Sequence, residues 1–138
     1  MTQFTILQIA LMLYGQRIPY LTGGNCPILG LDCSGFVCEV LRSKGHIGKE
    51  DYTAQGLYDH FKVIGRSQLS EGSLLFFGKS RTEISHVAIA ASDVDLIEAG
   101  GGDHTTTTVQ EAIKRNAYLR IRPIKWRSDL VAVLKVEI

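Results

Sequence analysis

The sequence of 138 residues has no long apolar run, no large excess of either charge and only three cysteines. A helix that spans a membrane needs about 20 consecutive apolar residues, and no stretch of the chain provides them. The formal net charge is +1, so no extended field that attracts nucleic acid or an anionic membrane is expected. Because three is an odd number, a framework of closed disulfides is not expected either.

The first fifteen residues also lack the basic start and the small-residue cleavage site of a signal peptide. We therefore expect a protein that is made in the cytoplasm without its own export signal. What remains is an ordinary globular composition, with 45% hydrophobic and 21% charged residues. This length fits a single domain over residues 1–138, with enough chain to bury a substantial core.

Two periodicities divide the chain into helices followed by strands. Apolar residues at helical spacing predict helices over 6–14 and 33–44, and a shorter helix is expected over 53–61. Strands are predicted at 73–77, 85–90, 96–99, 118–122 and 130–138, with one or two helical turns over 109–116. This order predicts an α+β fold whose helices pack on one face of a meander-like, mostly antiparallel sheet.

Cys33 is the first candidate for chemistry. It opens an apolar helical pattern, so we expect it in the first turn of a helix, with Asp32 as the N-cap. A thiol at a helix N-terminus ionises more readily, and the thiolate is the nucleophile. The neighbours Ser34 and Gly35 are small and leave room for a substrate. A lone cysteine on an apolar helix is more often a core residue, so the hypothesis depends on partners elsewhere.

A thiol nucleophile needs a base, and the base needs an orienting group. Among the four histidines, His86 begins an apolar strand, and Glu98 interrupts the apolar strand that follows. If these strands form a hairpin, Glu98 can lie beside His86, orient its ring and favour its charged form. Taken alone, each of these residues is more often a hydrogen-bonded core group. The rival orienting groups are His104 and Asp103, in a glycine-rich loop.

Four motifs stand in an order that resembles the NlpC-type cell-wall peptidases, which have a papain-like cysteine peptidase fold. They read PYLTGG at 19–24, LDCSGF at 31–36, EGSLLFF at 71–77 and SHVAI at 85–89. The D-C-S-G stretch followed by H-V-A-I is the specific pair, and the resemblance runs from about residue 6 to about residue 99.

The resemblance implies that Cys33 is the nucleophile and His86 the general base. The third polar position falls on Glu98, where most members of the family have His, Asn or Gln. Glutamate is therefore a departure from the family pattern. A glutamate at position 98 can still orient the His86 ring. Its negative charge beside the ring changes the pH range in which activity is expected.

The resemblance also implies the residues that bind substrate. Tyr20 matches a tyrosine whose hydroxyl lies near the nucleophile and binds substrate or stabilises the oxyanion. Asp32 and Ser34 match positions that shape the cleft, and Gln55 lies in a segment that closes one side of it. The substrate implied is a peptidoglycan stem peptide, cut typically between D-glutamate and a diamino acid. No cofactor, nucleic acid or membrane is expected to take part.

The absence of a signal peptide or wall-binding module in this sequence suggests a phage product, with tail or baseplate proteins as partners or with release at lysis. Three alternatives stand beside this reading. One is a thiol amidase or acyltransferase that acts on another amide, and another is a phage-tail structural subunit with a degenerate peptidase fold. The third is a metal site using Cys26, Cys33, His86 or His104, which their irregular spacing disfavours.

Overall fold

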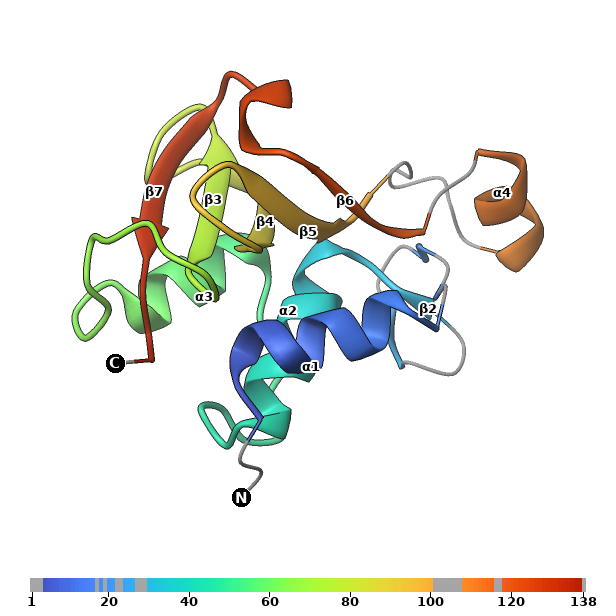
Figure 1. The fold of residues 1–138 in the computed structure, drawn as a ribbon, viewed down its shortest axis with the longest axis horizontal. Coiled ribbons are helices and arrows are strands. Elements are labelled where there is room, and N and C mark those ends of the chain that lie inside the picture. The colour runs from blue at the N-terminus through green and yellow to red at the C-terminus, as the bar shows by residue number, and fades with distance from the viewer. Residues whose placement is uncertain are drawn as a thin grey trace.

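The computed structural model describes residues 4–16, 18, 20–21, 24–26, 30–100, 108–115 and 118–137. Its main parts are a five-stranded antiparallel sheet and a group of three helices, α1 to α3, that lies against it (Figure 1). The fourth helix, α4, stands apart from this group in the same view. The α+β fold predicted from the sequence is therefore confirmed.

Side-chain caps define where the helices begin. Thr5 and Gln8 form a reciprocal capping box at the start of α1, and the side chains of Asp32, Thr53 and Thr108 cap the other three helices. The predicted helices are confirmed, with these bounds: α1 (Ile6–Tyr14), α2 (Cys33–Ser43), α3 (Ala54–Phe61) and α4 (Val109–Lys114). Gly45, just after α2, has a φ of +77°, the left-handed conformation in which helices often end.

The sheet has the strand order β6-β5-β4-β3-β7, and every neighbouring pair is antiparallel. The predicted meander is confirmed for four strands, while the last strand returns to pair with β3 at the opposite edge. The last strand is also shorter than the predicted 130–138. The bounds are β3 (Leu74–Gly78), β4 (Ile84–Ala90), β5 (Asp95–Ala99), β6 (Leu119–Pro123) and β7 (Leu130–Leu134).

Two short elements were not predicted. A two-stranded ribbon, β1 (Asn25–Cys26) and β2 (Gly30–Leu31), precedes α2. A 3₁₀ turn, η1 (Ile124–Trp126), connects β6 to β7. Strands of two residues and single 3₁₀ turns carry too little periodicity to be recognised in a sequence.

The sheet buries apolar side chains on both of its faces. One face packs against the helices, and α2 contributes Phe36, Val37, Val40 and Leu41 to that core. The other face holds a smaller cluster that includes Leu75 and Phe77 and is covered by Ile124 of η1. This explains why β3 reads as a continuous apolar run rather than an alternating one. Two layers of packing therefore hold the central strands, and these strands carry part of the site.

Gly35 lets the β1–β2 region approach α2 closely. A methyl group at this position would collide with the backbone carbonyl of Gly24, which also accepts the N–H of Asp32. We expect Gly35→Ala to lower the free energy of unfolding by about 1–3 kcal/mol, as overpacking of a rigid site does. The matched control is Gly15→Ala, where the nearest atoms are at 3.6 Å and the φ of −63° suits alanine. Urea unfolding of both variants measures the difference, and equal stabilities would contradict this prediction.

Candidate active site

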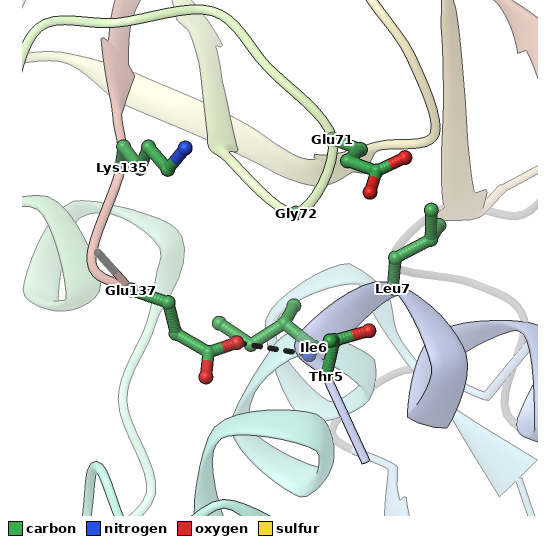
Figure 2. Close-up of a pocket in the computed structure, with 7 residues that line it drawn as sticks. All are labelled: Thr5, Ile6, Leu7, Glu71, Gly72, Lys135 and Glu137. Atoms are coloured by element: carbon green, nitrogen blue, oxygen red, sulfur yellow. Dashed lines mark hydrogen bonds between the residues drawn. The ribbon is translucent and has the colours of Figure 1, made fainter.

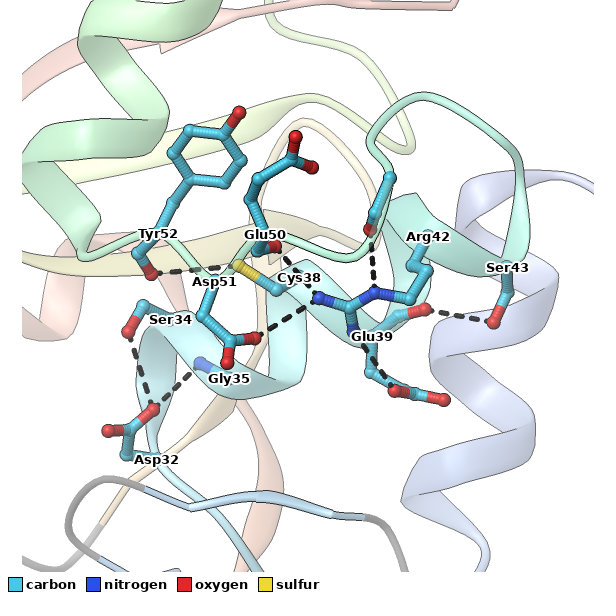
Figure 3. Close-up of polar contacts among 11 residues, drawn as sticks. Asp32, Ser34, Gly35, Cys38, Glu39, Arg42, Ser43, Glu50, Asp51 and Tyr52 are labelled. Carbon is cyan, nitrogen blue, oxygen red and sulfur yellow. Dashed lines mark hydrogen bonds and ion pairs between the residues drawn. The ribbon is translucent and has the colours of Figure 1, made fainter.

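Cys33 is the first residue of α2, as the sequence predicted, and its side chain is half-buried. Asp32 precedes it in an extended conformation and caps the helix, because its Oδ1 accepts the backbone N–H of Gly35 at 2.7 Å. The Ser34 hydroxyl donates to the same carboxylate oxygen at 3.3 Å. Figure 3 shows these two contacts on the first turn. The sulfur therefore sits at the positive end of a well-capped helix.

His86 lies in β4, beside a bulge in the pairing of β4 with β3. A bulge changes the direction in which a neighbouring side chain points. The His86 ring packs against Phe77, with 5.6 Å between the ring centroids. The residue is 9% exposed, and its Nε2 lies 2.7 Å from Oε1 of Glu98 in β5. The hairpin that the sequence suggested is formed, and it brings these two side chains together.

The second ring nitrogen of His86, Nδ1, is left for an interaction with the thiol. Nε2 is engaged by Glu98, and His86 also hydrogen-bonds to the side chain of Cys33, which leaves Nδ1 for that contact. Burial by itself lowers the pKa of His86, but the hydrogen bonds to Cys33 and Glu98 outweigh it and raise this pKa to about 9. The charged imidazole is thus favoured at neutral pH, as a thiolate–imidazolium pair requires.

Glu98 has a second partner that the sequence did not reveal. Its side chain is fully buried, and Oε2 accepts the Nε–H of Arg120 at 2.9 Å. Arg120 is directly opposite Glu98 in the pairing of β5 with β6. Burial raises the pKa of Glu98, but the bonds to His86 and Arg120 outweigh it and lower this pKa, so the carboxylate is ionised. The alternation of residues 118–122 predicted a strand, but only the register of this strand pair identifies the ion pair.

A pocket of about 270 Å³ opens beside His86 and Glu98. Its remaining lining residues are Tyr20, Ala99, Gly100, Arg120, Trp126 and Arg127. Arg120 and Arg122 both lie over the ring of Trp126, with their guanidinium carbons 5.2 and 4.2 Å from its centroid. Among the sequence predictions, Tyr20 is brought to this pocket, whereas Trp126 and Arg127 were missed.

A second hollow of about 210 Å³ lies at the α2 N-terminus. Asp32 and Ser34 line it together with Gly24, Gly35, Cys38, Asp51, Tyr52 and Thr53. Figure 3 shows most of these side chains, including Cys38, whose sulfur contacts the Tyr52 carbonyl oxygen at 3.6 Å. One hollow is thus lined by both chain neighbours of Cys33 and the other by His86, and each includes residues that the sequence assigned to substrate binding.

Gln55 makes its side-chain contacts within the protein. Its Oε1 accepts the backbone N–H of Ile84 at 2.8 Å, and its Nε2 donates to the Arg81 carbonyl oxygen at the same distance. These bonds tie α3 to the start of β4, two residues before His86. A direct contact between Gln55 and substrate stays a prediction.

Several other sequence predictions fall outside the described residues. These are the rival orienting groups His104 and Asp103, together with the side chain of Cys26. Within the ranges that the structure describes, no group of three or more His, Cys, Asp or Glu side chains could hold a metal ion. The same residues include no helix that is long and apolar enough to cross a membrane.

A further hollow lies at the start of α1 (Figure 2). Its lining is Thr5, Ile6, Leu7, Glu71, Gly72, Lys135 and Glu137. Glu137 accepts the backbone N–H of Ile6 at 2.9 Å and pairs with Lys44 at 3.1 Å. These contacts tie the end of the chain to the first helix. The lining contains neither a cysteine nor a histidine. This hollow therefore has no candidate nucleophile and base of the kind found at Cys33 and His86.

The two described cysteine side chains should differ sharply in reactivity. Cys38 is 1% exposed, and burial raises its pKa, whereas Cys33 is half-buried beside a charged imidazole. Because the thiolate is the reacting form, we expect iodoacetamide to alkylate Cys33 at least about 10-fold faster than Cys38 at pH 7. Peptide mapping by mass spectrometry after timed quenching measures both rates. Alkylation of Cys38 first would contradict this view of the site.

The fold and the Cys–His pair at a helix N-terminus define an α+β protein of the papain-like class. The model of the NlpC/P60 family matches residues 16–123, and the chain belongs to this family. No curated protein is similar enough to the chain to count as a match.

Three solved structures illustrate the likeness in fold. The NlpC/p60 domain of the peptidoglycan hydrolase SagA is 24% identical, with a TM-score of 0.68 over 95% of this chain and 96% of that one. The peptidoglycan hydrolase RipB from Mycobacterium tuberculosis is 17% identical, with a TM-score of 0.67 over 96% of this chain and 65% of that one. RipD from the same organism, described as a non-catalytic protein adapted to peptidoglycan binding, is 14% identical, with a TM-score of 0.65 over 97% and 99%.

Proposed function

We propose that this protein is a cysteine peptidase that hydrolyses amide bonds in the peptide part of peptidoglycan. The observation that carries the proposal is the chain of contacts from Cys33 through His86 to Glu98 at the start of α2. Family membership supports the substrate class, as does the description of SagA and RipB as peptidoglycan hydrolases. In this proposal Cys33 is the nucleophile, His86 the proton carrier and Glu98 a positioning residue.

The first step forms an acyl-enzyme. The Cys33 thiolate attacks the carbonyl carbon of the scissile amide, and the carbonyl oxygen gains a negative charge. Backbone N–H groups in the first turn of α2 lack intrahelical partners by geometry, so they suit stabilisation of this oxyanion. The His86 imidazolium then gives its proton to the leaving nitrogen, the C–N bond breaks, and the amine half departs.

The second step releases the acyl half. His86, now neutral, takes a proton from water, and the resulting hydroxide attacks the thioester carbon. The C–S bond breaks, the thiolate returns, and the imidazolium is restored. Glu98 stabilises the charged ring and holds its plane in both steps, because its carboxylate accepts the Nε2–H at 2.7 Å.

Two hollows support the assignment of substrate-binding residues. Tyr20 lines the pocket next to His86, while Asp32 and Ser34 line the hollow at the α2 N-terminus. We assign these three residues to substrate binding. Gln55 is assigned an indirect part, because its amide fixes the segment that leads into His86.

The experiment that tests the function is digestion of purified peptidoglycan. The protein is incubated with intact sacculi, and mass spectrometry of the released fragments identifies which amide bond has been cut. The control is the same protein after alkylation of Cys33. New amine and carboxyl ends that appear only with the unmodified protein are expected. Release of fragments by the alkylated protein to the same extent would overturn the cysteine mechanism.

The same experiment addresses the alternatives. Binding to sacculi without cleavage would favour a non-catalytic role such as the one described for RipD. Cleavage of other amides or esters, with sacculi left intact, would favour a thiol amidase or acyltransferase. The phage association and its tail or baseplate partners stay a prediction, because they were inferred from what the sequence lacks.

A further inference from the structure

We propose that Arg127 forms a carboxylate-binding subsite for the amine half of the substrate, on the residue that follows the scissile bond. The inference rests on the proposed function, because it uses the direction in which His86 hands over its proton. Arg127 lies just after η1, outside residues 16–123 that match the family model.

The position of the pocket determines which half of the substrate it receives. A general acid must lie beside the leaving nitrogen to protonate it. His86 and Glu98 line the pocket that also contains Arg127, whereas Asp32 and Ser34, which flank Cys33 in the chain, line a separate hollow. The amine half therefore belongs in the pocket with Arg127, and the acyl half in the other hollow.

The charges in this pocket favour an anion. Three of its lining side chains, His86, Arg120 and Arg127, are cationic, and Glu98 is the one carboxylate among the lining residues. Glu98 is shared between the first two cations. Arg127 is instead held by Asp129, which does not line the pocket. An incoming carboxylate would therefore meet an arginine whose counter-ion is not among the residues that line the pocket.

Arg127 is also held in a fixed orientation. Its Nε and Nη2 donate to the two oxygens of Asp129 at 2.9 and 2.8 Å, and its guanidinium carbon lies 5.1 Å from the centroid of the Phe77 ring. Among the described residues, its Nη1 group has no hydrogen-bond acceptor. Asp129 holds one edge of the guanidinium and the Phe77 ring lies against one face. The side chain is therefore already ordered, and binding of a ligand to its remaining N–H groups costs little further conformational entropy.

A carboxylate is the anion that fits this arrangement. A residue whose amino group is released from an amide carries its own carboxyl group two bonds from that nitrogen. Arg127 lines the same pocket as His86, the residue that would protonate the leaving nitrogen. The indole of Trp126 supplies an apolar wall of the same pocket. The geometry therefore favours substrates in which the residue after the cut bond keeps a free carboxylate.

The test compares two synthetic peptides that carry the bond cut in peptidoglycan. In one, the residue after the bond has a free α-carboxylate, and in the other this group is a carboxamide. We expect the wild-type protein to cleave the carboxylate form with a kcat/KM about 10- to 100-fold higher, as loss of a charge-assisted hydrogen bond implies. In Arg127→Gln this preference should vanish, because the rate on the carboxylate form alone should fall.

Lys125→Gln is the matched control, since it removes one nearby positive charge from a side chain that does not line the pocket. It should keep the wild-type preference. Equal rates of the wild-type protein on both peptides would overturn the inference, even if the variant failed to fold. An equal loss on both peptides in Arg127→Gln would overturn it too and indicate a general role near Cys33. If the wild-type protein cleaves neither peptide nor sacculi, the proposed function itself has failed.

Discussion

Replacing Cys33 by alanine is expected to reduce peptidoglycan hydrolysis to the background rate, a loss on the order of 10⁴-fold or more. No other described thiol lies next to His86, so nothing can form the acyl-enzyme in its place. The fold should persist, because Cys33 is a half-buried residue in the first turn of a helix that Asp32 still caps. The free energy of unfolding should change by no more than about 1 kcal/mol. Fragment release from sacculi and urea unfolding measure the two quantities.

Cys38→Ala is the matched control because it removes the other described thiol from the same helix. Cys38 is 1% exposed and packs in the core, so this change should cost about 1–2 kcal/mol of stability as a small cavity forms. Hydrolysis should continue, since Cys38 contacts the Tyr52 carbonyl rather than the base. The two variants therefore separate activity from stability. Hydrolysis by Cys33→Ala at the wild-type rate would exclude the mechanism.

The sequence predicted the parts of this site that depend on local structure. The placement of Cys33 follows from a turn, a capping residue and an apolar helical pattern, all within a dozen residues. His86 and Glu98 could be paired because a short connection makes a hairpin the natural arrangement of their strands. Each of these inferences needs only neighbouring residues or one strand pairing.

The residues that were missed depend on contacts between distant parts of the chain. Arg120 meets Glu98 because of the register between β5 and β6, and a shift of one residue would turn its side chain to the other face. Arg127 and Trp126 reach the pocket because η1 carries the chain over the sheet before β7 pairs with β3. Neither the register nor this return path has a signal in the local pattern of residues.

Glu98 is the fully buried carboxylate that contacts His86, and the second large effect is expected there. The charged form of His86, which the proposed mechanism uses as the proton donor, is lost as the pH rises through its pKa of about 9. Glu98→Gln keeps the shape of the side chain but removes the charge that favours the imidazolium. The alkaline limit of kcat/KM should therefore move to lower pH, with a loss of about 10-fold at the optimum.

A change at Arg120 should act on the alkaline limit of activity in the opposite direction to a change at Glu98. It competes with His86 for the Glu98 carboxylate and adds a positive charge near the ring. Arg120→Gln should therefore raise the alkaline limit or leave it in place, whereas Glu98→Gln lowers it. Glu98→Ala should cost more activity, about 100-fold, because orientation is lost as well. It should also cost about 3 kcal/mol of stability, since a buried carboxylate is removed from between two cations.

His104→Ala is the comparison that decides between Glu98 and the glycine-rich loop as the source of the third group. We expect its pH–rate profile to match that of the wild-type protein, because both oxygens of Glu98 are already bonded to His86 and Arg120. The profiles of Glu98→Gln, Arg120→Gln and His104→Ala are measured together on one peptide substrate. If His104→Ala alone lowers activity and Glu98→Gln follows the wild-type profile, the orienting role belongs to the loop. A downward shift of the alkaline limit in Glu98→Gln alone assigns it to the carboxylate, because only loss of the charge that stabilises the imidazolium moves that limit in this direction.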